Sequence, residues 1–274
     1  MINETVNFTL QDFRIKTRSI ANYTMSTHHF HDVYEIYFLN DGTRNYFIND
    51  TTHIVCAGNL VLIKPYDLHK TIDTGVSHSR VLINFNQDFL PFKDIKAILD
   101  ICFSTSSVMT LDFAMQNHIE EMIKLMVIEA NTENLYVQTK LQSQLINLLI
   151  DITGYMKLNN KADAKIAPAN QKIYEIIQYL KTNYSKNLTL NELSKEFFIS
   201  QYYMARVFKK TTGFTIFEYI HSLRIIEAQH LLKETSLKII DVAQAVGFHN
   251  ISNFGKVFKS LTTISPSNYR KMHK

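Results

Sequence analysis

Three histidines and one glutamate in the N-terminal part of the chain have the residue types and the spacing of a binding site. His29, His31 and Glu35 stand at i, i+2 and i+6, so on one continuous strand all three side chains would face the same side. His69 lies further along, after a Gly58…Pro65 segment. Imidazole nitrogens and a carboxylate suit Fe, Mn or Zn, and they also hydrogen-bond polar organic molecules. The pattern predicts a binding site and does not distinguish a metal ion from a polar organic molecule as its ligand.

Tyrosines near this cluster add rings and hydroxyl groups. Strand parity places Tyr37 on the side of Glu35 and Tyr34 on the opposite side. Such side chains suit a polar organic ligand such as a sugar. We therefore expect a small polar ligand to be bound by His29, His31, Glu35, Tyr37, Tyr46 and His69.

Short strands should position these residues, and helices should follow them. Residues 33–39, 44–48 and 59–63 are β-branched and aromatic and are separated by turn residues, which indicates a small antiparallel barrel or sandwich. Apolar residues at helical spacing over 119–127 and 137–152 then predict a hairpin of two helices. This hairpin is either a dimerisation surface or a cover for one side of the barrel.

The string HFHDVYEIYFLNDG resembles the first motif of the cupin family, His-x-His-x3-Glu-x6-Gly, through His29, His31, Glu35 and Gly42. The second motif is imperfect, because Pro65-Tyr-Asp-Leu-His69 lacks the internal glycine and is one residue short. The resemblance implies a β-barrel of the double-stranded β-helix type and raises the alternative of a cupin metalloenzyme or a metal sensor. We expect polar residues that line an effector pocket, no cofactor and no resident metal; His29, His31, Glu35 and His69 are the candidate ligands for an ion.

The last 90 residues contain two copies of one pattern, and an internal repeat takes priority over single motifs. Each copy reads as a helix, a tight turn and a second helix with apolar residues at i, i+3 and i+4, which is the anatomy of a helix-turn-helix. The segment 216–233 should be one helix that joins the copies. The anchoring residues of the two second helices are Met204, Val207 and Phe208 in the first copy and Phe254, Val257 and Phe258 in the second.

The opposite face of each second helix must then point outward, and it is basic and amide-rich. Such side chains can reach phosphates and base edges in the major groove, and an N-cap such as Ser200 directs a helix N-terminus toward a phosphate. The predicted DNA-binding residues are Ser200, Gln201, Tyr202, Ala205, Arg206, Lys209, His249, Asn250, Ile251, Ser252, Asn253, Gly255, Lys256 and Lys259.

The stretch LRIIEAQHLLKETSLKIIDVAQAVGFHNISNFGKVFKSLTTISPSNYR resembles the signature of AraC/XylS-type transcription regulators. The resemblance implies base contacts from the positions of Tyr202, Ala205 and Arg206 and from those of Ile251, Ser252, Gly255 and Lys256. Two departures matter. Phe198 occupies a turn position that favours left-handed backbone, at a cost of about 1 kcal/mol, and Ala205 and Gly255 have no group that can hydrogen-bond a base.

Charge and composition agree with a DNA-binding module at one end of the chain. Residues 169–274 carry 15 basic and 7 acidic side chains, a net charge of +8, whereas residues 1–168 carry 14 and 18, a net charge of −4. Two cysteines exclude a disulfide framework and favour a reducing cytosol. The sequence also lacks a signal peptide, an apolar run of about 18 residues, a phosphate-binding Gly-Lys-Ser loop and a Gly-x-Ser-x-Gly elbow.

Together these patterns predict an α+β protein that is a cytoplasmic, sequence-specific transcription activator and not an enzyme. Its expected partners are double-stranded DNA, a small-molecule effector, a second copy of the chain in a homodimer, and RNA polymerase, with no membrane. The expected domains are a cupin-like effector-binding domain at 1–110, a helical hairpin at 111–157, a linker at 158–168 and a double helix-turn-helix DNA-binding domain at 169–274.

Overall fold

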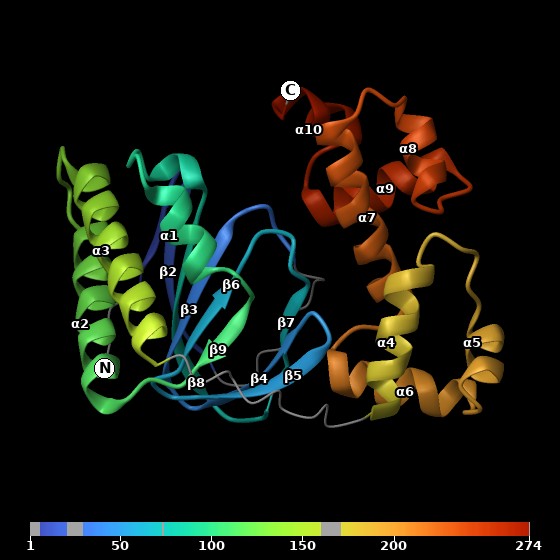
Figure 1. Ribbon diagram of the computed structural model, residues 1–274, viewed down its shortest axis with the longest axis horizontal. Coiled ribbons are helices and arrows are strands. Elements are labelled where there is room, and N and C mark those ends of the chain that lie inside the picture. The colour runs from blue at the N-terminus through green and yellow to red at the C-terminus, as the bar shows by residue number, and fades with distance from the viewer. Residues whose placement is uncertain (1–5, 21–29, 73, 160–170, 274) are drawn as a thin grey trace.

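The computed structural model describes residues 6–20, 30–72, 74–159 and 171–273, and within them nine strands form the N-terminal barrel (Figure 1). One sheet has the strand order β1-β2-β8-β3-β6-β9 and the other has the order β5-β4-β7, and every described pairing is antiparallel. The strands are β1 (Asn7–Leu10), β2 (Phe13–Ile20), β3 (Tyr34–Asp41), β4 (Thr43–Ile48), β5 (Thr51–Cys56), β6 (Leu60–Ile63), β7 (His69–Ile72), β8 (His78–Phe85) and β9 (Ser107–Met109).

Alternation along the strands separates an interior from two outer faces. On β3, Tyr37 and Leu39 join a small apolar cluster inside the barrel, whereas Ile36 and Phe38 belong to the core on the outer face of the larger sheet. Side chains on a strand alternate between faces, so the register of β3 with β6 and β8 fixes which residues can reach the interior. The strands that the sequence predicts over 33–39, 44–48 and 59–63 correspond to β3, β4 and β6.

Three helices cover the outer face of the larger sheet (Figure 1): α1 (Ile95–Cys102), α2 (Phe113–Ala130) and α3 (Val137–Leu158). The predicted hairpin of α2 and α3 is present, and its buried residues share one apolar core with β2, β3, β6 and β8. Helix α1 and strand β9 were not among the expected elements; both are short, and the apolar residues Ile95, Ile98, Leu99 and Cys102 do follow a helical period over α1. The hairpin therefore closes one side of the barrel and leaves its opposite face exposed.

The C-terminal region is all helical and contains two helix-turn-helix units joined by one long helix, so the α+β fold class is confirmed. The first unit pairs α5 with α6, the second pairs α8 with α9, and α7 connects them. Capping boxes at Thr189 and Thr215 fix where α5 and α7 begin. The helices are α4 (Gln171–Asn183), α5 (Leu190–Glu196), α6 (Gln201–Thr212), α7 (Ile216–Glu234), α8 (Ile239–Ala245), α9 (Ile251–Thr262) and α10 (Pro266–Met272).

The predicted linker at 158–168 lies almost entirely outside the described residues. Among the helices that the structure describes, none combines the length and the apolar character needed to cross a membrane.

Candidate DNA interface and effector pocket

Helix α6 presents a polar face to solvent. Met204 and Phe208 are fully buried in the core of the C-terminal domain, and this anchoring turns the remaining positions outward. Of the predicted residues of this unit, Ser200, Gln201, Tyr202, Arg206 and Lys209 are exposed and Ala205 is half-buried.

Helix α9 repeats this arrangement in the second unit. Phe254 and Phe258 take the buried positions, and the pattern of burial over 251–260 matches that over 201–210 position by position. Of the predicted residues of this unit, His249, Asn250, Ile251, Ser252, Asn253, Lys256 and Lys259 are exposed and Gly255 is half-buried.

Both helices begin at a side-chain cap. Ser200 Oγ accepts a hydrogen bond from the Tyr203 amide at 3.3 Å, and Asn250 Oδ1 accepts one from the Asn253 amide at 3.1 Å. The other amides of each first turn, together with the positive end of the helix dipole, are left for an anion such as a phosphate. Each outward face therefore combines cationic side chains with a helix N-terminus.

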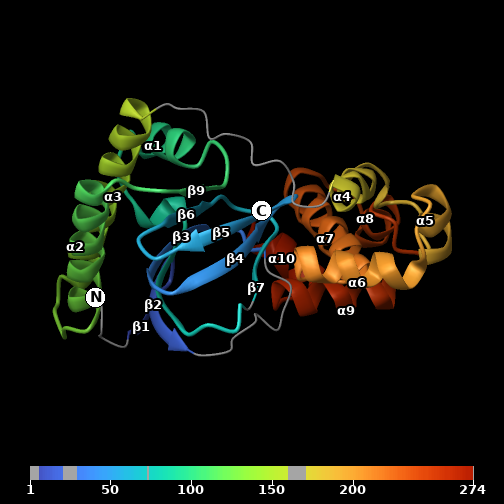
Figure 2. The ribbon, with the colours of Figure 1, turned by 90° about the horizontal axis from the view of Figure 1, so that it is seen from below.

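Helix α7 determines the separation of the two units. It has 19 residues, which corresponds to about 28 Å at 1.5 Å per residue, comparable to the roughly 34 Å between successive major-groove faces on one side of a duplex. The axes of α6 and α9 run in nearly the same direction in both ribbon views (Figures 1 and 2). At the turn before α6, Phe198 has the predicted left-handed backbone, with φ 54°, and its side chain is 91% exposed.

Inside the barrel, Glu35 is the centre of a buried hydrogen-bonded cluster. Its Oε1 accepts a hydrogen bond from the Tyr46 hydroxyl at 2.8 Å, and its Oε2 accepts one from Asn84 Nδ2 at 3.1 Å. His31 Nε2 lies 3.0 Å from Oε2, and His69 Nε2 lies 3.8 Å from Oε1. The structure thus brings His31, Glu35, Tyr46 and His69 together, as the sequence predicts.

The charges in this cluster stabilise one another. Burial by itself raises the pKa of Glu35, but the imidazoles of His69 and His31 outweigh it and hold that pKa well below the ordinary value. For His69, burial lowers the pKa, and the Glu35 carboxylate more than reverses this, so the net direction is upward. Burial, together with the charge of Glu35, raises the pKa of Tyr46 well above its ordinary value. At neutral pH the centre is a carboxylate that receives hydrogen bonds.

One part of the sequence interpretation of this cluster is wrong. His31 does not lie on a continuous strand with Glu35, because β3 begins only at Tyr34 and a bend covers Asp32 and Val33. The bend brings the imidazole back onto the Glu35 carboxylate. His29 lies outside the described residues. Tyr37 faces the interior, as parity predicts, but it contacts the Tyr46 ring edge-on, with ring centroids 5.3 Å apart.

The residues of this cluster fit a transition-metal ion. His31 Nδ1 donates to the Val33 carbonyl and His69 Nδ1 donates to the Asp67 carbonyl, each at 2.8 Å. These bonds direct both Nε2 atoms toward Glu35, as backbone carbonyls do behind metal-bound histidines. The ligand atoms of His31, Glu35 and His69 all lie within 4.8 Å of one another. Two imidazoles and one carboxylate form a donor set that an ion such as Zn, Fe or Mn accepts.

Two family models match the chain, and curated relatives extend over most of it. Residues 15–149 match the AraC-like ligand binding domain, and residues 193–272 match a helix-turn-helix domain. The melibiose operon regulatory protein of Escherichia coli is 24% identical over 276 aligned residues, which cover 94% of this chain and 88% of that protein. The transcriptional activator RhaR of Mannheimia succiniciproducens is 25% identical over 251 residues, 88% of this chain and 86% of its own.

The chain belongs to the AraC family. It is a transcription regulator with a ligand-binding barrel and a helix-turn-helix DNA-binding domain. Among solved structures, ToxT from Vibrio cholerae O395 is similar over 97% of this chain and 99% of its own, with 16% identity and a TM-score of 0.40.

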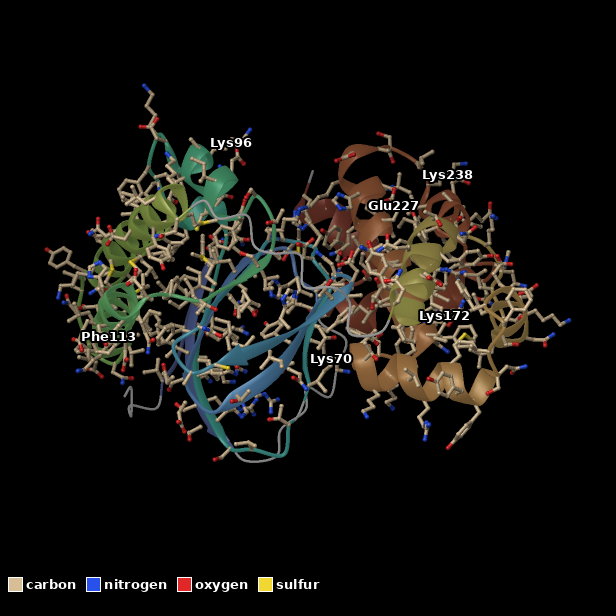
Figure 3. The ribbon with its side chains drawn as sticks, turned by 60° about the horizontal axis from the view of Figure 1, so that its bottom comes forward. Lys70, Lys96, Phe113, Lys172, Glu227 and Lys238 are labelled. Atoms are coloured by element: carbon tan, nitrogen blue, oxygen red, sulfur yellow. The ribbon has the colours of Figure 1, made fainter. Side chains whose placement is uncertain are left out.

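In this AraC-family regulator the barrel contacts the end of α6 and the start of α7, a junction that the sequence patterns did not predict (Figure 3). Lys70 Nζ donates to the Gly213 carbonyl at 2.7 Å, Thr52 Oγ1 donates to the Thr211 carbonyl at 2.6 Å, and the Tyr219 hydroxyl donates to the Asn49 carbonyl at 3.0 Å. Gly213 is the left-handed C-cap of α6, with φ 78°. The barrel therefore holds the backbone at which α6 ends.

An apolar contact lies beneath these hydrogen bonds. Phe47 is fully buried, and its ring lies 5.9 Å from Phe214 and 6.3 Å from Tyr219, centroid to centroid. The sequence contains one signal of this contact: Tyr46, Phe47 and Ile48 are consecutive apolar residues, which is typical of a strand buried on both faces.

A second contact reaches the other helix-turn-helix unit. The Tyr66 hydroxyl lies 3.3 Å from the Tyr269 hydroxyl and accepts a hydrogen bond from Lys233, and its ring packs against His230. Because His230 and Lys233 lie near the end of α7 and Tyr269 lies on α10, the barrel contacts both ends of the long helix that joins the two units.

Proposed function

We propose that this regulator binds operator DNA through the outward faces of α6 and α9, one in each of two adjacent major-groove segments. The observation that supports this most directly is the matched pattern of burial on the two helices, which leaves a cationic face and a capped N-terminus exposed on each. Base readout would fall on Tyr202, Arg206, Ser252 and Lys256, since Ala205 and Gly255 supply no hydrogen bond to a base. Lys209 and Lys259 would contact phosphates.

Replacement of Arg206 by alanine should weaken specific operator binding by about 1–3 kcal/mol, as expected for an arginine that contacts a base edge. Lys259→Ala is the matched comparison, because a lost phosphate contact weakens specific and non-specific binding together and makes the salt dependence shallower. Titration of operator and random duplexes at several salt concentrations separates the two effects. Operator affinity that Arg206→Ala leaves unchanged would show that this residue does not contact DNA.

The barrel would sense a small polar effector, and strand alternation gives it a direct route to the DNA-binding helices. On β7, His69 faces the Glu35 cluster, and the next residue, Lys70, holds the Gly213 carbonyl. On β4, Tyr46 donates to Glu35, and the next residue, Phe47, packs on Phe214. A ligand that shifts either strand moves the Glu35 cluster and the contact with the end of α6 together. The ligand changes the affinity for DNA to the extent that it binds the shifted and unshifted conformations with different affinities.

The relatives support a sugar or a similar polar metabolite as the effector and activation as the outcome, since one is named for the melibiose operon and another is named a transcriptional activator. Contact with RNA polymerase, a cytoplasmic location and the absence of catalysis belong to the same proposal. Selection of bound sites from random DNA, repeated with candidate sugars present, tests it. If no metabolite changes the selected DNA sites, the affinity for DNA or the assembly state of the protein, the proposal of an effector switch is overturned.

The outer face of the helical hairpin would form a homodimer. Ile150, Gly154 and Leu158 follow one exposed line on α3 at i, i+4 and i+8, and no atom lies within 4 Å of the position that a Cβ of Gly154 would take. Leu125 and Ile128 on the neighbouring helix α2 are also exposed. A glycine between two large apolar residues allows a second helix to approach closely.

The variant Ile150→Glu should weaken dimerisation by about 2 kcal/mol or more, the loss typical of a central apolar contact in an interface. Sedimentation across a range of protein concentrations measures the shift toward monomer. Lys96→Glu on α1 is the control for an added negative charge on an exposed helix. A monomer–dimer equilibrium that is the same in wild type and Ile150→Glu would place the interface elsewhere.

A second candidate function is a metal-dependent sensor, which the orientation of the two imidazoles toward Glu35 favours. His31, Glu35 and His69 would hold the ion, which would supply a fixed positive charge at the centre of the barrel. Metal analysis of protein purified without chelator, with Glu35→Gln as the comparison, distinguishes the two candidates. A stoichiometric metal that the variant loses supports the metal sensor, and metal-free wild-type protein rules it out.

A further inference from the structure

The interior of the barrel contains a buried cation that has no counterion among the residues that the structure describes. Arg80 lies on β8, two residues from Leu82 and four from Asn84, and therefore shares their inward face. Its side chain is 7% exposed. Within the described residues its guanidinium makes no hydrogen bond and no ion pair, and it lies instead over the Tyr37 ring, 5.4 Å from the centroid.

An unpaired hydroxyl lies beside this guanidinium. Tyr37 is 1% exposed, and its hydroxyl has no hydrogen-bond partner among the described residues. A phenol keeps its proton at neutral pH and can donate it in a hydrogen bond. The guanidinium and the hydroxyl are thus two neighbouring groups with hydrogens to donate and, within the described part of the chain, no acceptor.

Among the described residues, the charged side chains around Arg80 do not supply it with an acceptor. Arg80 stands directly opposite Arg18 in the pairing of β2 with β8, so the residue across the strand offers it no negative charge. Among the described residues of this interior, the acidic group is Glu35, whose two oxygens already face Tyr46, Asn84 and His31. A buried charge without a partner is costly, and an anionic ligand would remove that cost.

We propose that Arg80 and Tyr37 form an anion subsite in the barrel and that the effector is a small organic acid whose carboxylate they bind. A guanidinium pairs with a planar carboxylate through two parallel hydrogen bonds, and the Tyr37 hydroxyl supplies a third. The apolar side chains of Leu39, Val55 and Leu82 belong to the cluster in the same interior, and the body of such a molecule would contact them. The effector role of the acid rests on the proposed function, whereas the anion subsite does not.

The first test measures thermal unfolding of the full chain in sodium acetate and in sodium chloride of equal ionic strength. A site with a dissociation constant of about 10 mM multiplies the folding constant about elevenfold at 100 mM acetate. Wild type should show this gain over chloride. Arg80→Met should lack the gain and should be more stable than wild type in chloride, because it removes the unpaired charge.

Matched variants make the result specific to the subsite. Arg14→Met removes an exposed arginine from the same sheet and should behave as wild type in both salts. Tyr37→Phe, which removes only the hydroxyl, should keep about one tenth of the acetate affinity. Equal acetate stabilisation in wild type and Arg80→Met, or none in either, would overturn the subsite. The same measurement is made in inorganic phosphate at the same ionic strength. If phosphate stabilises wild type more than acetate does, the assignment of the subsite to a carboxylate is overturned.

A second test distinguishes failure of the subsite from failure of the effector role. Glucuronate and glucose share a ring and differ in one carboxylate, so each is titrated against wild type and Arg80→Met while operator affinity is followed. Glucuronate that binds wild type but not Arg80→Met and alters operator affinity supports the whole proposal. Acetate or glucuronate binding that depends on Arg80 without any change in operator affinity keeps the subsite and overturns the effector role. If glucose alters operator affinity equally in wild type and Arg80→Met, the barrel does bind an effector, and the proposal that this effector is an acid is overturned.

Discussion

Glu35→Ala is expected to lower the free energy of unfolding by about 3–5 kcal/mol, the cost typical of removing one partner from a buried ion pair. The carboxylate receives hydrogen bonds from Tyr46 and Asn84 and faces the imidazoles of His31 and His69. Its loss leaves the buried Tyr46 hydroxyl and the Asn84 amide without their acceptor, and it removes the negative charge that the fully buried His69 imidazole faces. Denaturant unfolding of metal-free protein near pH 5.5 measures the change.

Glu121→Ala is the matched control for this prediction. Glu121 is 67% exposed and pairs with Lys124 at 3.5 Å on the same helix, so its removal should change stability by no more than about 0.5 kcal/mol. Equal losses from the two variants would contradict the central place of the Glu35 cluster in the stability of the barrel.

The same cluster predicts how stability depends on pH in chelator-treated protein. The pKa of His69 is raised above its ordinary value of 6.5, so its contribution is complete below that value and is lost as pH rises through the higher pKa of the folded state. The pKa of Glu35 is lowered below its ordinary value of 4.5, so its contribution is present above that value and is lost only in acid. The stability difference between wild type and His69→Asn should therefore be largest between about pH 4.5 and 6.5 and should shrink at higher pH.

The DNA-binding domain was the part of the molecule most fully predicted from sequence, because its signals are local. Apolar spacing within single helices identifies Met204 and Phe208 as buried, and the 50-residue repeat transfers the same assignment to Phe254 and Phe258. Caps such as Ser200 and Asn250 are set by residues three positions away. Such short-range features do not depend on how the rest of the chain folds.

The barrel was predicted less completely, because its chemistry depends on contacts between distant residues. Strand parity correctly placed Tyr37 inside, but it could not show that a bend brings His31 onto Glu35. Burial of Arg80 follows from the pairing of β8 with β2 and β3, and the sequence by itself gives an arginine no reason to lie in an interior. Asn84 was likewise missed, since its role depends on its register with Glu35.

Phe47→Ala is expected to cost about 3–5 kcal/mol, as usual for the truncation of a fully buried phenylalanine, and to separate the barrel from the DNA-binding helices. Phe47 is the apolar centre of the junction, where it meets Phe214 and Tyr219. The hydrogen bonds of Thr52, Lys70 and Tyr219 surround it. Without its ring, these bonds must hold two parts of the molecule together around a cavity.

The observable consequence of Phe47→Ala is a loss of coupling as well as of stability. Calorimetry should resolve two unfolding transitions in Phe47→Ala where wild type shows one. An effector that changes operator affinity in wild type should change it less in the variant, because strands β4 and β7 no longer move the end of α6. Ile54→Ala is the control, since Ile54 lies on the neighbouring strand β5 and is 68% exposed. A single transition and an undiminished effector response in Phe47→Ala would show that the signal does not pass through this junction.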